Sequence, residues 1–204
     1  RGGCGIEKGG ELTELDRTVM SYSCDRARSV SWGLFGGLPS SPHGAWMNPG
    51  TEDEKYLGAI FSNVPVEKGD SFVRPSSGGG GLGDPLKRGP ESVLEDVIDD
   101  YVSVERAKKD YGVVIHVIDA EIDAYEIDEE ATKEAREYIR ANRKQWIKED
   151  PQTVEQLFHD GKIDELDMIR MYGAIYDHHE NRVLPTSTAQ YREMLEDKMV
   201  PHWD

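Results

Sequence analysis

Cysteine is scarce in this chain of 204 residues, which contains only Cys4 and Cys24. The two cysteines do not form a Cys-x-x-Cys pair, so the sequence holds neither the ligand spacing of a zinc knuckle nor the even set of cysteines that builds a disulfide framework. We therefore expect two reduced thiols and a cytoplasmic protein. We find no metal-ligand set in this segment.

Long apolar runs and clusters of basic residues are also missing. No run of about 18 apolar residues could cross a bilayer. The opening Arg1-Gly2-Gly3 lacks the charged head and apolar core of a signal peptide, so we expect a start within a longer polypeptide or after processing. With 40 acidic against 24 basic residues the net charge is -16. Binding to phosphate backbones needs clustered Lys and Arg, so we expect no nucleic-acid partner, and without a long apolar run we expect no membrane.

Several familiar catalytic motifs are absent as well. No Gly-x-Ser-x-Gly, His-Glu-x-x-His or Walker A sequence occurs, which leaves no self-contained hydrolase, zinc-protease or P-loop site. Gly78, Gly80 and Gly83 formally match the dinucleotide-binding pattern, but Pro75-Ser76-Ser77 precede them in place of a strand and Asp84-Pro85 follow in place of a helix. This glycine run is either a functional loop that a ligand or another chain approaches closely, or a flexible surface loop.

What the chain does contain is divided between two halves that meet near Pro90. Residues 1–90 hold 18 of the 21 glycines and balance 11 acidic with 10 basic residues, whereas residues 91–204 hold 29 acidic and 14 basic residues. Short β-forming runs alternate with turn residues in the first half, and apolar residues recur every three to four positions in the second. We predict an α+β fold, with a β-rich, Gly/Pro-rich N-terminal half followed by a mostly helical C-terminal half. The excess acid is expected mostly on solvated helix faces.

Individual elements follow from the same signals. We expect a strand at Thr18–Ser23 and a tight, buried turn at Trp32–Pro39, where large apolar residues alternate with glycines. After Pro90 the sequence predicts a helix pair, then a buried strand at Val113–Ile118 and an antiparallel return at Ile122–Ile127. Later helices are predicted to begin at Asp128, at Asp150-Pro151, near Ile163 and after a capping box at Ser187–Gln190.

Two pairs of polar residues are candidates for chemistry outside the glycine run. Asp25 and Arg26 follow the first predicted strand, and a guanidinium there could bind a carboxylate, bicarbonate or phosphate group. A structural ion pair across a loop is the more frequent alternative. His178 and His179 are metal-ligand types, but adjacent side chains on a helix diverge by about 100°, so we interpret them as an exposed helix end.

A longer pattern spans nearly 40 residues. It starts with Ser77-Gly78-Gly79-Gly80-Gly81-Leu82-Gly83-Asp84-Pro85-Leu-Lys-Arg-Gly-Pro-Glu-Ser-Val-Leu-Glu-Asp-Val97 and continues through Tyr101-Val-Ser to Asp110-Tyr-Gly-Val-Val-Ile115. This order strongly resembles the C-terminal signature of the hydantoinase B/oxoprolinase family. Further similarity lies in Arg1-Gly-Gly-Cys-Gly, in Cys24-Asp-Arg, in Trp32–Gly37 and in Asn48-Pro-Gly. The resemblance covers about residues 1–145, and Cys24 stands where family members commonly have a serine.

The resemblance implies that this segment corresponds to the final part of a longer subunit. It implies a β-rich part of a hydantoinase B-like domain at 1–89, completed at 90–148 by a helix pair, a β-hairpin and a helix, and a helical C-terminal extension at 149–204. Asp25, Arg26, Asp84 and the glycine loop are expected to shape a substrate cavity or an interface, while the catalytic residues stay unassigned. The loop glycines are Gly78, Gly79, Gly80, Gly81 and Gly83.

The same resemblance implies partners and cofactors. Family members work beside a hydantoinase A-like protein that binds ATP, and the acetone enzymes have a small third subunit, so a hetero-oligomer is expected. ATP and a divalent metal, manganese in the carboxylase branch, are both expected outside this segment.

The extension beyond residue 148 narrows the function. It is longer than the tail of simple hydantoinases and is similar to that of acetone carboxylase large subunits, which suggests an ATP-dependent ligase that makes acetoacetate from acetone and bicarbonate. An ATP-dependent hydantoinase, an oxoprolinase or an acetophenone carboxylase is the alternative within the family. A non-catalytic assembly subunit is the alternative of another class.

Overall fold

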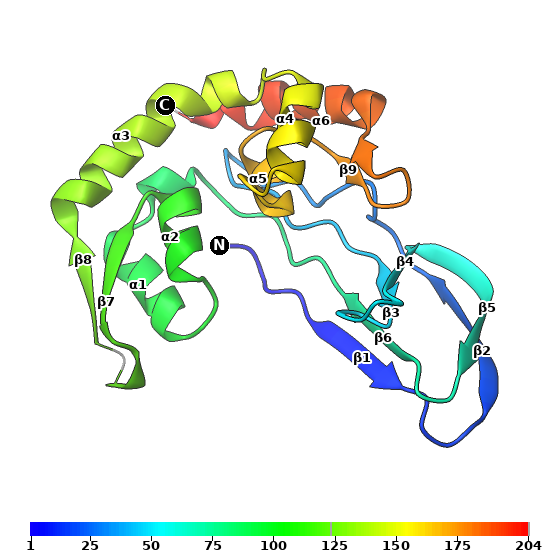
Figure 1. Ribbon diagram of the computed structural model, residues 1–204. Coiled ribbons are helices and arrows are strands. Elements are labelled where there is room, and N and C mark those ends of the chain that lie inside the picture. The colour runs from blue at the N-terminus through cyan, green and yellow to red at the C-terminus, as the bar shows by residue number, and fades with distance from the viewer. Residues whose placement is uncertain (123, 204) are drawn as a thin grey trace.

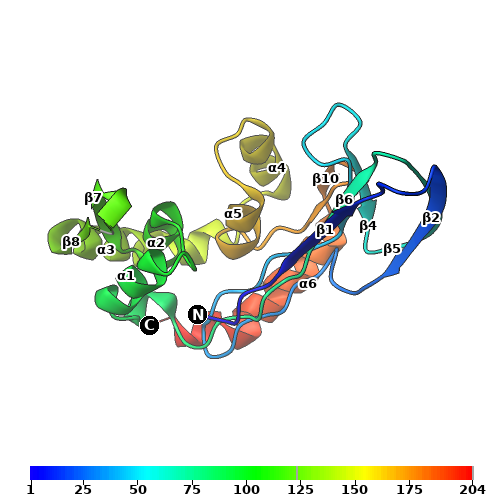
Figure 2. The same cartoon turned by 90° about the horizontal axis from the view of Figure 1, so that it is seen from below.

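The computed structural model describes residues 1–122 and 124–203, which contain six α-helices and ten strands. Figure 1 shows the strand-rich first half on one side, two helices and a β-hairpin on the other, and the C-terminal helices across the top. Seen from below, in Figure 2, the hairpin β7–β8 and the ribbon β2–β5 lie at opposite ends of the molecule. The predicted α+β class, β-rich first and mostly helical second, is confirmed.

The first half consists of one small sheet and one ribbon. Four antiparallel strands are ordered β1-β6-β3-β4, and β2 pairs with β5 beside them. The predicted strand at Thr18–Ser23 is confirmed as part of β2. Ala45, Met47, Leu57 and Val66 form the buried core between sheet and ribbon. The strands are β1 (Glu7–Glu11), β2 (Arg17–Ser23), β3 (Ala45–Met47), β4 (Lys55–Gly58), β5 (Ile60–Glu67) and β6 (Ser71–Pro75).

The middle of the chain forms a compact helical layer on a hairpin. Ser103 caps the second helix by accepting a hydrogen bond from the Arg106 N–H at 3.1 Å, and Gly112 ends it with φ of 62°. Asp128 caps the third helix in the same way, so the predicted helix pair and its successor are confirmed. After the short 3-10 turn Pro85–Lys87, the elements are α1 (Pro90–Ile98), α2 (Val104–Tyr111), β7 (Val114–Asp119), β8 (Ala124–Asp128) and α3 (Glu129–Trp146).

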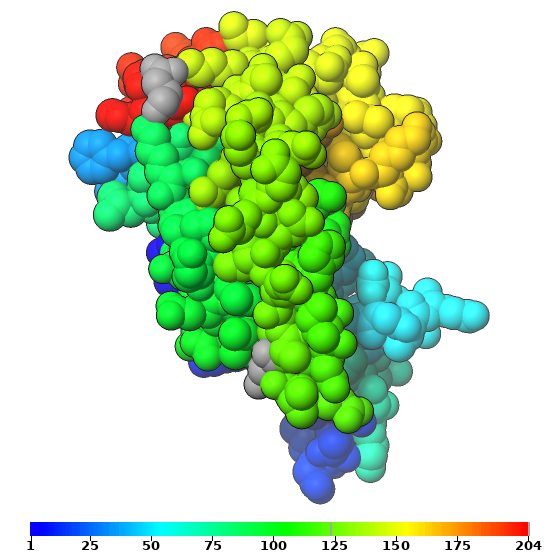
Figure 3. Space-filling model, turned by 90° about the vertical axis from the view of Figure 1, so that its left-hand side faces the viewer, coloured from blue at the N-terminus to red at the C-terminus, as the bar shows by residue number. Residues whose placement is uncertain are grey.

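The predicted buried strand at Val113–Ile118 is buried only at its start. Val113 and Ile115 belong to the core of this layer, whereas Val117 and Ile118 are 50% and 65% exposed, because the hairpin projects beyond α1 and α2. Its antiparallel partner is β8, as expected, although Asp123 of the predicted return lies outside the described residues. Figure 3 shows α3 exposed along one face of the molecule.

The C-terminal segment mixes helices with a minimal hairpin. Its core brings Ile169, Ile175, Leu195 and Met199 against Trp203 and, from the first half, Val30. No helix in the described ranges combines the length and apolar character that a bilayer span requires. The elements are α4 (Pro151–His159), α5 (Glu165–Arg170), β9 (Tyr176–Asp177), β10 (Arg182–Val183), α6 (Pro185–Lys198) and the 3-10 turn Val200–His202.

Two predictions for this segment are wrong. Ser187–Gln190 is not a capping box, because α6 already begins at Pro185, whose fixed φ suits the first helical position and leaves Leu184 as an N-cap without a side-chain hydrogen bond. His178 and His179 are not a helix end. They lie in the turn between β9 and β10, where rings of Trp46 and Tyr56 pack within 5.0 Å of the His178 ring.

The segment Trp32–Pro39 also differs from its prediction. Its large side chains are not buried: Trp32, Leu34 and Phe35 are 48%, 55% and 62% exposed. Backbone occupies the interior instead, since a Cβ on Gly33 would lie 2.0 Å from the carbonyl oxygen of Gly37. The glycines therefore turn the backbone inward and leave the aromatic side chains on the surface.

Candidate functional site

Three glycine-containing segments lie side by side near the centre of the fold. The run 78–83 is held between residues 1–5 and residues 33–38 by backbone hydrogen bonds. The Gly79 N–H donates to the Gly3 carbonyl at 2.9 Å, the Gly81 N–H to Leu38 at 2.8 Å, and the Gly83 N–H to Leu34 at 2.8 Å. The glycine run is thus a packed, hydrogen-bonded segment.

The close approach of these backbones explains which positions must be glycine. A Cβ on Gly78 would lie 2.2 Å from the Gly3 carbonyl oxygen, and one on Gly80 would lie 2.1 Å from the Trp32 carbonyl oxygen. Neither distance occurs between real atoms of that kind. The nearest atoms would be 3.5 Å away for Gly79 and 3.4 Å away for Gly81, which is ordinary van der Waals contact. The run therefore alternates between positions that exclude a side chain and positions that accept a methyl group.

A cavity of about 660 Å³ opens beside these segments, a volume in the range of small-molecule sites. The glycine segments form one wall. The opposite wall comes from the 3-10 turn before α1, the loop between α1 and α2, and α2 itself, through Lys87, Arg88, Tyr101, Arg106 and Tyr111. This is the candidate functional site.

The structure brings most of the sequence-predicted site residues to this cavity. Gly78, Gly79, Gly81, Gly83 and Asp84 line it. Gly80 packs behind the wall against Trp32. Asp25 and Arg26 are not among the described residues that line the cavity.

Arg26 is connected to the glycine run through His43. The Arg26 guanidinium donates to the Val30 carbonyl at 3.2 Å, and its own carbonyl accepts from the His43 N–H at 3.2 Å. The His43 Nδ1 in turn accepts from the Ser77 N–H at 3.3 Å. Burial, with the nearby charges of Arg74 and Arg26, lowers the pKa of His43 and keeps the ring neutral, as an accepting Nδ1 requires. Sequence reasoning missed His43, which stands in a Pro-His-Gly turn without a recognisable pattern.

Asp84 is the carboxylate that ends the glycine run, and it is fully paired. Arg143 of α3 donates to both of its oxygens, at 2.8 and 2.9 Å, and the Leu86 N–H donates at 3.0 Å. Arg143 also bonds the Trp203 carbonyl, while the Trp203 indole N–H donates to the Gly36 carbonyl at 2.7 Å. The pair Asp84 and Arg143 therefore fastens the glycine run to α3 and to the end of the chain.

The pairing of Asp84 with Arg143 predicts that the free energy of unfolding falls at acid pH. Burial acts to raise the pKa of Asp84, but the hydrogen bonds from Arg143 and Leu86 outweigh it, so the pKa lies below its usual value. A lowered pKa in the folded state contributes stability above the ordinary aspartate pKa of about 3.9, and this stability is lost as the pH falls through the lowered value. The free energy of unfolding of the wild type should exceed that of Asp84→Asn at pH 6, and the difference should shrink toward pH 3. An equal difference at both pH values would contradict the assignment.

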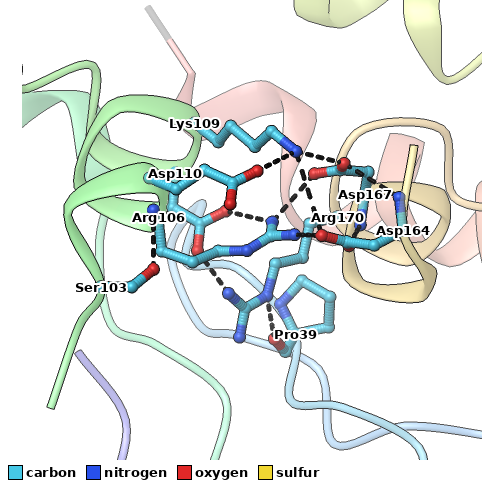
Figure 4. Close-up of polar contacts among 9 residues, drawn as sticks. Pro39, Ser103, Arg106, Lys109, Asp110, Asp164, Asp167 and Arg170 are labelled. Carbon is cyan, nitrogen blue, oxygen red and sulfur yellow. Dashed lines mark hydrogen bonds and ion pairs between the residues drawn. The ribbon is translucent and has the colours of Figure 1, made fainter. Parts of the chain in front are cut away.

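A second group of charges joins α2 to α5 on the other side of the cavity (Figure 4). Arg106 contacts Asp164, and its Nη1 lies 2.9 Å from Asp167, whose other oxygen lies 2.8 Å from the Lys109 ammonium. Arg170 pairs with Asp110, and its Nε donates to the Pro39 carbonyl at 3.3 Å.

Most acidic residues of the second half are exposed, as expected, and the carboxylates of Asp110 and Asp167 are exceptions. The side chains of Asp110 and Asp167 are only 5% and 1% exposed. Burial raises the pKa of Asp110, with Arg170 and Arg106 opposing the shift. The spacing of residues along each helix did not indicate that these aspartates are buried and paired, because their partners come from both α2 and α5, which lie more than 50 residues apart in the sequence. Residues 164–170 of the extension therefore take part in building the cavity wall.

No group of three or more His, Cys, Asp or Glu side chains that could hold a metal ion occurs in residues 1–122 and 124–203. The residues that line the cavity offer hydrogen bonds and charge from arginine, lysine, tyrosine and backbone groups.

The comparisons with a family model and with individual proteins indicate the same family. The model of the hydantoinase B/oxoprolinase family matches residues 1–85. The B-type subunit of a putative D-/L-hydantoinase from Pseudomonas sp. is 31% identical over 137 residues, which cover 67% of this chain and 22% of the relative. The alpha subunit of an acetone carboxylase from Xanthobacter autotrophicus is 28% identical over 176 residues, and the match covers 70% of this chain and 22% of the relative. The beta subunit of a caprolactamase from Pseudomonas jessenii is 39% identical over 129 residues, and the match covers 56% of this chain and 21% of the relative.

The chain thus spans about a fifth of the length of the curated relatives that it matches. The family match includes Arg1-Gly-Gly-Cys-Gly and the glycine run 78–83. These are two of the three backbone segments whose close packing forms the cavity wall. Through residues 1–85, the chain belongs to the hydantoinase B/oxoprolinase family.

Proposed function

We propose that this chain is the C-terminal part of the large subunit of an ATP-dependent acetone carboxylase, which makes acetoacetate from acetone and bicarbonate. The observation that carries the proposal is the alignment with the alpha subunit of an acetone carboxylase, which covers 70% of this chain, against 67% for the hydantoinase relative and 56% for the caprolactamase relative. The contacts of the extension are consistent with it, because Arg170 and Trp203 bond the Pro39 and Gly36 carbonyls beside the cavity.

In this proposal the described residues have a supporting role in catalysis. They shape and hold the cavity, while ATP and a divalent metal, manganese, bind elsewhere in the complex. A hydantoinase A-like partner supplies ATP binding, and a small third subunit completes a cytoplasmic hetero-oligomer. The three parts 1–89, 90–148 and 149–204 then act as one unit at the end of the large subunit.

Purification of the native complex and an activity assay test the proposal. With acetone, bicarbonate, ATP and manganese, we expect acetoacetate and AMP to form only when acetone is present. Omission of bicarbonate is the control and should abolish acetoacetate. Absence of acetone-dependent AMP formation would rule out the carboxylase assignment.

ATP-dependent opening of a cyclic amide is the second candidate. It is supported by the 39% identity to the caprolactamase relative and the 31% identity to the hydantoinase relative. The same complex, offered hydantoins, 5-oxoproline and caprolactam, would hydrolyse ATP in response to one of them and not to acetone.

The candidate of another class is a non-catalytic assembly subunit. Removal of such a subunit from the complex would leave every activity in place. Mass spectrometry gives the mass of the native polypeptide. A mass far above the 22.9 kDa of this chain would show that the segment is part of a longer subunit and not a separate one.

A further inference from the structure

We infer that the glycine-walled cavity binds a small molecule through a carboxylate or phosphate group, at the end lined by Arg1, Lys87 and Arg88. This inference holds whichever substrate the assembled enzyme uses. It starts from an imbalance of charge: the chain carries a net charge of -16, yet five cationic and only two acidic side chains line the cavity.

The two acidic side chains of the wall are already neutralised by protein groups. Asp84 is held by Arg143 from behind the wall, and Asp110 by Arg106 and Arg170. Each carboxylate is thus paired with at least one arginine, and the charge of Lys87 also acts on Asp84. The α2–α5 side of the cavity is therefore close to neutral.

The other end of the cavity has positive charge in excess. Arg1 and Arg88 share a single carboxylate, that of Asp96, at 3.0 and 2.6 Å. Lys87 makes no ion pair and no side-chain hydrogen bond within the described residues. Three cations thus face one carboxylate, which leaves a local excess of two positive charges in a strongly acidic protein.

Two tyrosines supply uncharged donors at the same end. Tyr101 lies under the Arg1 guanidinium, 3.9 Å from ring centroid to Cζ, and Tyr111 lies 5.9 Å from that of Arg88. Neither hydroxyl has a hydrogen-bond partner within the described residues, although Tyr111 is half-buried. Burial and the charge of Asp110 raise the pKa of Tyr111, so its hydroxyl keeps its proton and can donate.

Together these groups offer donors without a matching acceptor. Within the part of the chain that the structure describes, the Lys87 ammonium forms no ion pair or hydrogen bond, although its charge acts on Asp84, and the hydroxyls of Tyr101 and Tyr111 have no hydrogen-bond partner. The guanidiniums of Arg1 and Arg88 provide the surrounding positive field. Oxygen atoms of a carboxylate or phosphate are the acceptors that such a set recognises. The volume of about 660 Å³ exceeds that of a single ion and accommodates a small organic acid or phosphate ester.

Calorimetric titration of the full chain with inorganic phosphate and, separately, with acetate tests the inference at low ionic strength. We expect saturable binding of at least one anion, weakened by added NaCl because the site is partly open to solvent. Lys87→Ala should weaken binding at least about tenfold, because it removes a hydrogen bond between two charged groups. Tyr111→Phe, which removes only the hydroxyl, should weaken it about threefold to tenfold.

The matched control is Lys108→Ala, which removes the same charge from an exposed position on α2 that does not line the cavity. Binding should be unchanged in this variant, and thermal unfolding curves should show that all three variants fold. The phosphate and acetate arms decide which group the cavity prefers. Absence of saturable binding in both arms, or equal weakening by Lys87→Ala and Lys108→Ala, would overturn the inference. The carboxylase proposal is tested separately, by activity of the complex.

Discussion

Replacement of Arg143 by methionine should lower the free energy of unfolding by about 3–5 kcal/mol, because it leaves the buried carboxylate of Asp84 without its cation. The Asp84 side chain is 2% exposed and that of Arg143 is 7% exposed, so water cannot replace the lost hydrogen bonds. Methionine keeps an unbranched apolar stem of similar reach, which limits the effect of a new cavity. The substitution also removes the hydrogen bond that Arg143 donates to the Trp203 carbonyl.

Chemical denaturation measures the effect, with Arg140→Met as the matched control. Arg140 is an exposed residue of the same helix, and its replacement should change the free energy of unfolding by less than about 0.5 kcal/mol. Adding Asp84→Asn to Arg143→Met should recover part of the loss, because the uncompensated charge is then removed. If Arg143→Met and Arg140→Met cost the same, the pair does not fasten the glycine run to α3.

The sequence predicted best those features that depend on neighbours along the chain. Ser103, Gly112 and Asp128 mark helix ends in the structure as they do in the sequence, because a cap needs only a side chain and the backbone three residues away. The capping box at Ser187 failed because Pro185 offered an earlier start that local rules also allow.

Features that depend on distant partners could not be predicted in the same way. Arg106 looks like an exposed helix residue in the sequence, and only the folded chain brings it to Asp164 and Asp167 of α5. The glycine run was recognised as part of a family pattern, but its physical reason lies in the backbones of Gly3 and Trp32, which approach from other parts of the chain. The sequence therefore pointed to the glycine run, most of which lines the cavity, but it did not show the ion pairs that hold the cavity wall.

The second large effect is expected at Gly80. A methyl group there would lie 2.1 Å from the carbonyl oxygen and 2.4 Å from the carbonyl carbon of Trp32, both backbone atoms that cannot rotate away. Gly80→Ala must therefore separate the run 78–83 from the segment 32–38, which costs at least the roughly 1–3 kcal/mol typical of overpacking and more if the backbone hydrogen bonds break. We expect a loss of about 3 kcal/mol in the free energy of unfolding.

Gly79→Ala is the control one position away, within the same four glycines. Its methyl group would meet nothing closer than the Gly3 nitrogen at 3.5 Å, and its φ does not lie in the left-handed region. Alanine restricts the unfolded chain more than glycine does, so this variant should be neutral or more stable by about 0.4–1 kcal/mol. Opposite results at adjacent positions would show that close backbone packing fixes the glycines. Equal tolerance of both substitutions would instead mean that the run is a flexible loop, and that the cavity wall it forms is not fixed.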